Sequence, residues 1–157
     1  MVNGAGVAIR QMTTADIPAV WELERRLFPV DAWPEQMFYD ELSQTDTRLY
    51  WVAESGGEIV GYCGMMCVLP LADVQTIAVV PACEGRGIGS ALLAGLIEEA
   101  RRRGAEDVLL EVRADNPRAR DLYLRHGFEQ IHVRRRYYRD GVDALIMRKV
   151  LRDQPGA

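Results

Sequence analysis

The sequence predicts an α/β fold in which a mixed central sheet of about six or seven strands carries helices on both faces. Segments of alternating apolar residues, typical of strands, are interleaved with segments whose apolar residues recur every three or four positions, typical of helices. Glycines and prolines mark the boundaries between these segments. The resulting order is strand, helix, helix, three strands, helix, strand, helix and two strands.

The first half of the chain contains two helices and three of these strands. The strand over residues 7–12 is followed by Thr13-Thr14-Ala15-Asp16, which can cap a helix. That helix has an apolar stripe that includes Val20 and Leu27, and Pro34 begins a second helix that runs to about Gln44. Strands are then expected over residues 49–54, 58–68 and 73–80, the first two joined by a hairpin at Ser55-Gly56-Gly57.

The second half alternates helices and strands. Leu92, Leu93, Leu96, Ile97 and Ala100 form the apolar face of a helix over residues 90–103 that ends at Gly104. The remaining predicted elements are a strand over 107–113, a helix from Asn116-Pro117 to Gly127, and a closing hairpin of residues 128–139 and 142–151 around Asp140-Gly141. On such a strand Tyr137 and Tyr138 point to opposite faces.

Length and composition indicate one soluble domain over residues 1–151 with a flexible tail over 152–157. The chain has 157 residues, of which 48% are hydrophobic and 27% charged. No apolar run reaches the roughly 20 residues of a membrane span, and no secretory signal is recognisable. Cys63, Cys67 and Cys83 lack metal-ligand spacing, so we expect reduced thiols, a cytoplasmic protein and no bound metal. Cys63 and Cys67 are interpreted as core residues.

The charge is unevenly distributed along the chain, although the net charge is only −4. Residues 12–47 contain eight acidic side chains and only two basic ones, Arg25 and Arg26. Such a segment can be ordinary solvated helix surface, or it can form an acidic rim that attracts a cationic substrate. Both interpretations remain open, and no direct contact with nucleic acid or membrane is expected.

The segment from Ile77 to Gly89 is the strongest local signal. A β-branched strand ends at Pro81 and passes through Glu84-Gly85-Arg86-Gly87-Ile88-Gly89 into a helix. Glycines allow the backbone amides to approach a ligand closely, and the helix N-terminus favours an anion. The turn therefore suits a phosphate-bearing cofactor, although glycine-rich turns of this kind also occur for packing reasons alone.

Two later segments complete the pattern. Glu111 lies in the strand end Leu109-Leu110-Glu111-Val112-Arg113-Ala114-Asp115-Asn116, and Tyr123 follows twelve residues later in the segment Ala119 to Phe128. With the glycine turn, this set resembles the GCN5-related N-acetyltransferase (GNAT) family over nearly the whole chain. The resemblance implies the GNAT fold and acetyl-coenzyme A as co-substrate. Glu84 departs from the family pattern, which has glutamine or arginine there, and we expect Arg86 to offset its charge.

Within that family the chain is most similar to the RimI type, which acetylates the N-terminal alanine of a small-subunit ribosomal protein. The matching segments are Trp33-Pro34, Glu111 to Asn116, Arg134 to Tyr138, and Asp143 to Met147. The resemblance implies direct acetyl transfer to the basic N-terminal peptide of a ribosomal protein, by an enzyme that is a monomer or weak dimer.

The resemblance also implies roles for individual residues. Glu111 is the expected general base and Tyr123 the expected general acid. The expected cofactor contacts are Ile77, Ala78, Val79, Gly85, Arg86, Gly87, Ile88, Gly89, Ser90 and Asn116. The expected substrate contacts are Trp33, Asp73, Arg136 and Tyr138.

These roles agree with the chemistry of acyl transfer. The attacking amine must be neutral, and an α-amino group, with a pKa of about 8, loses its proton more readily than a lysine near 10.4. Glu111 can take that proton if burial raises its pKa, the N–H of Val79 can polarise the thioester carbonyl, and the Tyr123 phenol can protonate the leaving thiolate.

Each role has a structural alternative. Glu111 is also what a solvent-facing strand end would carry, Tyr123 has the spacing of a core residue, and Asn116 can be only a helix cap. The function has alternatives as well: acetylation of a small amine such as a polyamine or an antibiotic, or a non-catalytic subunit that binds acyl-coenzyme A.

Overall fold

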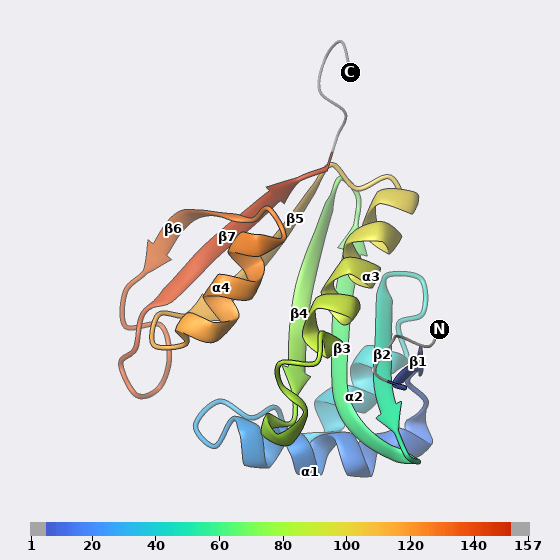
Figure 1. Ribbon diagram of the computed structural model, residues 1–157. Coiled ribbons are helices and arrows are strands. Elements are labelled where there is room, and N and C mark those ends of the chain that lie inside the picture. The colour runs from blue at the N-terminus through green and yellow to red at the C-terminus, as the bar shows by residue number, and fades with distance from the viewer. Residues whose placement is uncertain (1–5, 152–157) are drawn as a thin grey trace.

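The central feature of the computed structural model, which describes residues 6–151, is a seven-stranded mixed sheet with helices on both faces (Figure 1). The order of helices and strands is the one that the sequence predicts. The elements are β1 (Ala8–Gln11), the 3-10 turn η1 (Thr14–Asp16), α1 (Ile17–Leu27), α2 (Glu35–Leu42), β2 (Arg48–Ser55), β3 (Glu58–Val68), β4 (Leu71–Val79), the 3-10 turn η2 (Pro81–Cys83), α3 (Ile88–Arg102), β5 (Asp107–Arg113), α4 (Pro117–Arg125), β6 (Glu129–Arg134) and β7 (Ala144–Val150).

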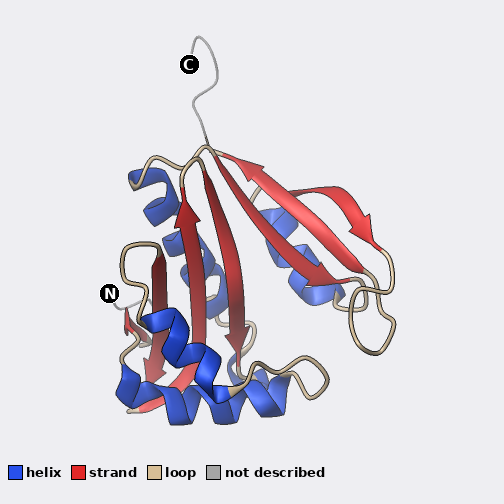
Figure 2. Ribbon diagram, turned by 180° about the vertical axis from the view of Figure 1, so that it is seen from behind, coloured by secondary structure: helices blue, strands red, loops and turns tan. Residues whose placement is uncertain are grey.

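The sheet is split between β4 and β5. Its strand order is β1-β2-β3-β4-β5-β7-β6, and every neighbouring pair is antiparallel except β4 and β5. These two parallel strands pair only from Leu71↔Asp107 to Asp73↔Leu109 and then diverge, as Figures 1 and 2 show. The sheet therefore has a first half, β1 to β4, and a second half, β5 to β7, with an opening between them.

Each face of the sheet has its own core. Helices α3 and α4 cover one face, and α1 and α2 cover the other (Figures 1 and 2). The predicted apolar face of α3 is buried throughout, and Cys63 and Cys67 lie in the same core cluster, as expected from the sequence. On the opposite face, α1 and α2 bury Val20 and Phe38 against the strands. Burial of these side chains is the main force that holds the helices on the sheet.

Buried glutamates attach the first two helices to the sheet. Glu24 in α1 accepts hydrogen bonds from the Tyr62 hydroxyl (2.7 Å) and the Trp33 backbone N–H (3.0 Å), and burial raises its pKa. Glu41 in α2 accepts from the Tyr50 hydroxyl (2.7 Å). Because unpaired buried carboxylates are costly, these bonds fix both helices and the loop that begins after α1.

The closing hairpin is shorter than predicted. Strand β6 ends at Arg134 and β7 begins at Ala144, so residues 135–143 form a loop. Arg136 adopts a left-handed backbone conformation (φ 51°), which a strand does not allow, and its N–H donates to Asp143 Oδ1 (2.9 Å). The expectation that Tyr137 and Tyr138 occupy opposite faces of a strand is therefore wrong.

Two further sequence expectations concern the ends of the chain and membranes. The tail expected over residues 152–157 lies outside the described residues. Over residues 6–151, the helices are too short or too polar to cross a membrane.

Candidate active site

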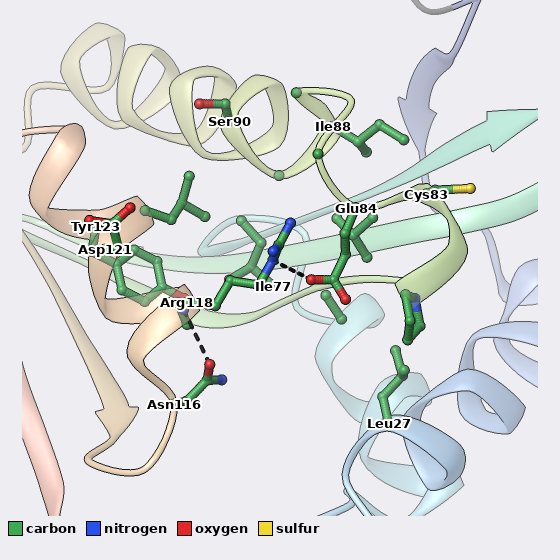
Figure 3. Close-up of a pocket in the computed structure, with 18 of the residues that line it drawn as sticks. Leu27, Ile77, Cys83, Glu84, Ile88, Ser90, Asn116, Arg118, Asp121 and Tyr123 are labelled. Atoms are coloured by element: carbon green, nitrogen blue, oxygen red, sulfur yellow. Dashed lines mark hydrogen bonds and ion pairs between the residues drawn. The ribbon is translucent and has the colours of Figure 1, made fainter.

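A pocket of about 720 Å³ lies where the split sheet opens. It is bounded by the end of β4, the glycine turn, the beginning of α3, and α4 (Figure 3). Its size is in the usual range for a small-molecule or cofactor site. The predicted cofactor residues that line it are Ile77, Ala78, Val79, Gly85, Gly87, Ile88, Gly89, Ser90 and Asn116. Arg86 is exposed and lies outside the lining.

The glycine turn has the backbone geometry of an anion site. Gly85 (φ 83°) and Gly87 (φ 80°) are left-handed, and Gly87 is the N-cap of the 15-residue helix α3. A Cβ added at either glycine would meet no atom within 4 Å, so neither is glycine for lack of room. They are required by the backbone conformation, which brings the free N–H groups of a helix start to the pocket.

Strand β4 presents further amides to the opening. The N–H of Val80 donates to the Val60 carbonyl oxygen of β3 (2.9 Å). Because backbone N–H groups alternate in direction along a strand, the N–H of Val79 points away from β3 and toward the opening. Strand β5 has already diverged at this level, so it does not take up that N–H. The N–H that we expect from the sequence to polarise the thioester carbonyl therefore faces the opening.

Arg118 in α4, rather than Arg86, compensates Glu84. The two side chains form an ion pair across the pocket, which Figure 3 shows as a dashed line. Arg125, one further cation on the same helix, also lines the pocket. Neither arginine is predicted from the sequence as a pocket residue, although their seven-residue spacing puts them on one face of a helix.

Two polar contacts organise the ends of the pocket. Asn116 Oδ1 accepts the backbone N–H of Ala119 (3.2 Å), so the helix-cap interpretation of Asn116 is confirmed, and the same residue also lines the pocket. Ser90 Oγ lies 2.6 Å from His126 Nε2, and burial lowers the pKa of His126. The imidazole is therefore biased toward its neutral form beside a pocket that suits an anion.

Tyr123 ends the pocket on the α4 side. It is only 5% exposed and packs edge-on against Phe128, with 6.0 Å between ring centroids. Burial raises the pKa of its hydroxyl, with a smaller contribution from Tyr138, so the phenol remains protonated at neutral pH. Tyr123 is thus both a core residue and an O–H group at the pocket.

Glu111 approaches the opening from the other face of the sheet. Val112 and Leu110, its neighbours in β5, belong to the core under α3 and α4, so Glu111 points to the opposite side by strand alternation. The Glu111 side chain is exposed, so the burial that was expected to raise its pKa is absent. Burial and, second, the charge of Glu111 raise the pKa of Asp73, and the charge of Glu111 also raises the pKa of Tyr137.

Tyr138 lies near both proposed catalytic groups. Burial and the charge of Glu111 raise its pKa to about 12, and it in turn raises the pKa of Tyr123. The rings of Tyr137 and Tyr138 meet edge-on at 5.2 Å. The loop over residues 135–143 therefore places both tyrosines near Glu111, which a strand would not do.

The other predicted substrate residues are dispersed. The ring of Trp33 packs against Phe38 (5.1 Å) and Tyr50 (6.5 Å), outside the pocket. Arg136 is exposed on the loop over residues 135–143. Of the four predicted substrate contacts, the structure brings Asp73 and Tyr138 close to Glu111, whereas Trp33 packs against the core on the α1–α2 face.

The residues of the pocket fit a long anionic cofactor with an apolar segment. The amides of the glycine turn and the cations Arg118 and Arg125 suit phosphate, and Ile77, Leu122 and Phe28 supply apolar surface. No group of three or more His, Cys, Asp or Glu within residues 6–151 is arranged to hold a metal ion.

Comparisons with known proteins agree with this geometry. The family described as Acetyltransferase (GNAT) family matches residues 17–128. N-alpha-acetyltransferase RimI of Mycobacterium tuberculosis is 44% identical over 149 residues, which is 91% of this chain and 92% of that protein. The [ribosomal protein bS18]-alanine N-acetyltransferase of Escherichia coli is 37% identical over 144 residues, covering 88% of this chain and 94% of the relative.

Solved structures show the same fold. The crystal structure of the Escherichia coli ribosomal-protein-S18-alanine N-acetyltransferase superposes with a TM-score of 0.84 at 33% identity, covering 96% of this chain and 98% of the other. Arabidopsis thaliana NAA60, crystallised with acetyl-CoA, shares the fold at 19% identity, with a TM-score of 0.83 and coverage of 92% and 98%. The chain belongs to the GNAT family of acetyltransferases.

Proposed function

We propose that this protein transfers the acetyl group of acetyl-coenzyme A directly to the N-terminal alanine amine of ribosomal protein bS18. The observation that carries the proposal is the end-to-end similarity, at 37% identity, to an enzyme named for this reaction. The positions of Glu111 and Tyr123 at the two sides of the opening support it. A cytoplasmic location belongs to the same proposal.

Acetyl-coenzyme A is held, in this proposal, by the pocket between β4 and α4. Gly85, Gly87 and Gly89 with the start of α3 hold the pyrophosphate through backbone amides, and Ser90 adds a hydroxyl. Arg118 and Arg125 add positive charge at the rim. When bound, acetyl-coenzyme A supplies a thioester whose carbonyl carbon accepts an amine.

Three groups at the opening have separate roles in acyl transfer. Glu111 takes a proton from the attacking amine, directly or through one water, as the new C–N bond forms. The N–H of Val79 stabilises the charge that develops on the carbonyl oxygen. As the C–S bond breaks, Tyr123 donates its proton to the departing thiolate. Its raised pKa keeps the phenol protonated until that step.

The acceptor side favours a cationic peptide terminus. Asp73 pairs with Leu109, two residues before Glu111 on β5, and after burial the charge of Glu111 is the second cause of its raised pKa. The two carboxylates can receive an ammonium group before its proton is lost. Tyr138 borders the same space. Trp33 and Arg136 complete the proposed substrate contacts farther along the peptide.

A direct assay separates this function from its alternatives. Coenzyme A release should be rapid with a short peptide that has the bS18 N-terminus, weak with the same peptide carrying an acetylated N-terminus, and weak with spermidine. Activity on spermidine alone would overturn the peptide assignment, and no release with any amine, despite coenzyme A binding, would indicate a non-catalytic subunit. In cells that lack the protein, mass spectrometry should find bS18 with a free N-terminal alanine.

A further inference from the structure

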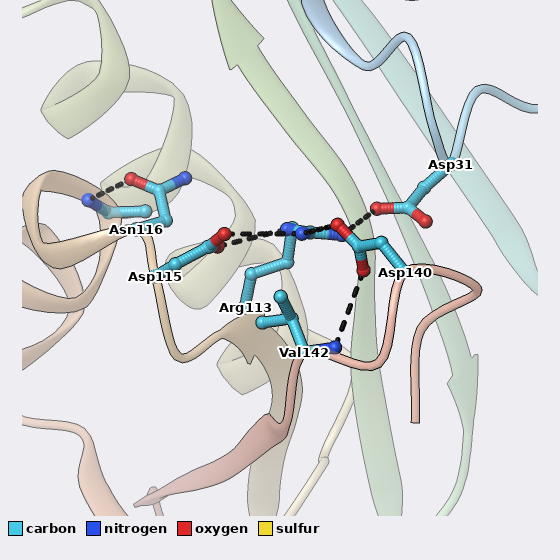
Figure 4. A network of polar contacts seen from close by, with 7 residues as sticks. Asp31, Arg113, Asp115, Asn116, Asp140 and Val142 are labelled. Carbon is cyan, nitrogen blue, oxygen red and sulfur yellow. Dashed lines mark hydrogen bonds and ion pairs between the residues drawn. The ribbon is translucent and has the colours of Figure 1, made fainter. Parts of the chain in front are cut away.

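Arg113, the last residue of β5, is a half-buried cation that the proposed mechanism does not use. Its guanidinium contacts three aspartates at once (Figure 4). Nη1 lies 2.5 Å from Asp31 Oδ2, Nη2 lies 2.5 Å from Asp140 Oδ2, and Nε lies 3.0 Å from Asp115 Oδ1. The side chain is only 19% exposed, so solvent screens these contacts less than those of a surface ion pair.

The three aspartates come from three different connections. Asp31 is in the loop between α1 and α2, Asp115 in the loop between β5 and α4, and Asp140 in the loop between β6 and β7. The first loop belongs to the first half of the sheet and the other two to the second half. Since β4 and β5 stop pairing at Asp73↔Leu109, the Arg113–Asp31 contact joins the halves where no backbone ladder does.

The same guanidinium also orders a residue next to the proposed catalytic groups. It lies over the ring of Tyr138, 4.8 Å from its centroid. After burial, the charge of Glu111 contributes to the raised pKa of Tyr138, and Tyr138 contributes to the raised pKa of Tyr123, so Tyr138 lies near both groups. Arg113 is also two residues from Glu111 on the same strand, so both side chains point to the same face.

We propose that Arg113 is a positioning residue that holds the α1–α2 loop against the β6–β7 loop and thereby shapes the acceptor side of the active site. An arginine is needed because its planar fork directs several N–H groups at separate carboxylates. A lysine keeps the charge but presents one compact ammonium group, which cannot contact all three aspartates in this arrangement. The proposal rests on the proposed function for its kinetic consequence, but not for the coupling between the loops.

The kinetic test compares Arg113→Lys with the wild type, with both substrates varied. We expect the KM for the alanine-first peptide to rise about tenfold, while the KM for acetyl-coenzyme A stays within about twofold. Arg101→Lys, a substitution in an exposed ion pair far along α3, is the matched control and should change neither value. An unchanged peptide KM, or an equal rise in both KM values, would overturn the proposal.

A second measurement does not need turnover. Hydrogen exchange of Asp31→Asn should become faster in residues 135–143 as well as in residues 29–33, because the contact joins the two loops. Exchange in α3 should be unchanged. Faster exchange confined to residues 29–33 would show that the loops are not coupled, whether or not the enzyme acetylates the peptide. Inactivity of the wild type on the peptide, with coupled loops, would instead remove the proposed function alone.

Discussion

The cofactor side and the acceptor side of the active site are built in different ways. The proposed cofactor side takes about half of its lining from one contiguous segment, from Ile77 to Ser90, and offers the backbone amides of the glycine turn and the end of β4. The acceptor side collects side chains from β4, β5 and three loops, and its contacts are mostly between charges, as around Arg113. A binding site made of backbone amides can therefore be predicted from a local sequence motif. A binding site made of side chains depends on how segments far apart in the chain pack together.

The largest expected effect concerns Glu111 and Tyr123, the proposed general base and general acid. Glu111→Gln and Tyr123→Phe should each lower kcat by roughly 10²–10⁴-fold, because each removes one proton transfer. Steady-state coenzyme A release measures this. Glu129→Gln, an exposed glutamate on β6, is the control and should have normal turnover. Normal turnover in both active-site variants would eliminate the proposed mechanism.

A smaller effect tests the backbone nature of the cofactor side. Gly87→Ala forces a side chain into a left-handed position and should raise the Kd for coenzyme A about tenfold, because binding must restore the strained turn. Gly89→Ala places its Cβ at an ordinary contact distance from Leu122 (3.5 Å) and should change the Kd less than about threefold. Calorimetric titration of both variants checks this, and equal Kd values would contradict it.

Asp73→Asn tests the electrostatics of the acceptor side. Burial and, to a lesser degree, the charge of Glu111 raise the pKa of Asp73 above its ordinary 3.8, so ionisation of Asp73 progressively destabilises the fold as the pH rises from about 3.8 through the raised pKa. We expect the variant to have a Tm roughly 1–2 °C above that of the wild type at pH 7, and to lose this advantage as the pH falls through the raised pKa, with none left below about 4. Thermal denaturation against pH measures it.

The same substitution should have the opposite effect on the substrate. Loss of one carboxylate beside Glu111 should raise the peptide KM about threefold to fivefold, because the ammonium group loses a partner. A variant that is less stable at pH 7, or one with an unchanged peptide KM, would remove Asp73 from the acceptor side.

The smallest effect concerns Glu84. Its carboxylate beside the glycine turn repels phosphate, but Arg118 already neutralises much of that charge. Glu84→Gln should therefore lower the Kd for coenzyme A only about twofold to threefold, and Glu98→Gln, at the far end of α3, should leave it unchanged. A weaker affinity in Glu84→Gln would mean that the ion pair organises the pocket instead.

Most of the fold was predictable, and the exceptions have a common cause. The periodicity predicts every helix and strand in order, and the buried face of α3 is the predicted one. The hairpin of β6 and β7 was predicted too long, because the apolar and aromatic residues near Tyr137 and Tyr138 have strand character. Strand β6 ends because Arg136 has a left-handed backbone conformation and its N–H donates a hydrogen bond to the Asp143 side chain. The spacing of apolar residues does not predict such a contact.

The candidate site divides in the same way. The sequence proposes the glycine turn, Glu111 and Tyr123 as candidates, and the structure places the turn and Tyr123 around one pocket. The partner of Glu84 was expected to be Arg86, which is two residues away in a turn that points its side chain to solvent. The actual partner, Arg118, is 34 positions away and is brought near because α4 borders the opening.

The sequence by itself determined the order of elements, the core faces of the helices and the glycine turn, because these depend on local periodicity and backbone conformation. Only the tertiary structure decided that β4 and β5 separate after Asp73↔Leu109, that Tyr137 and Tyr138 lie together beside Glu111, and that Arg113 joins three loops. Those features depend on contacts between residues far apart in the chain, where charge and shape complementarity replace sequence spacing as the controlling factor.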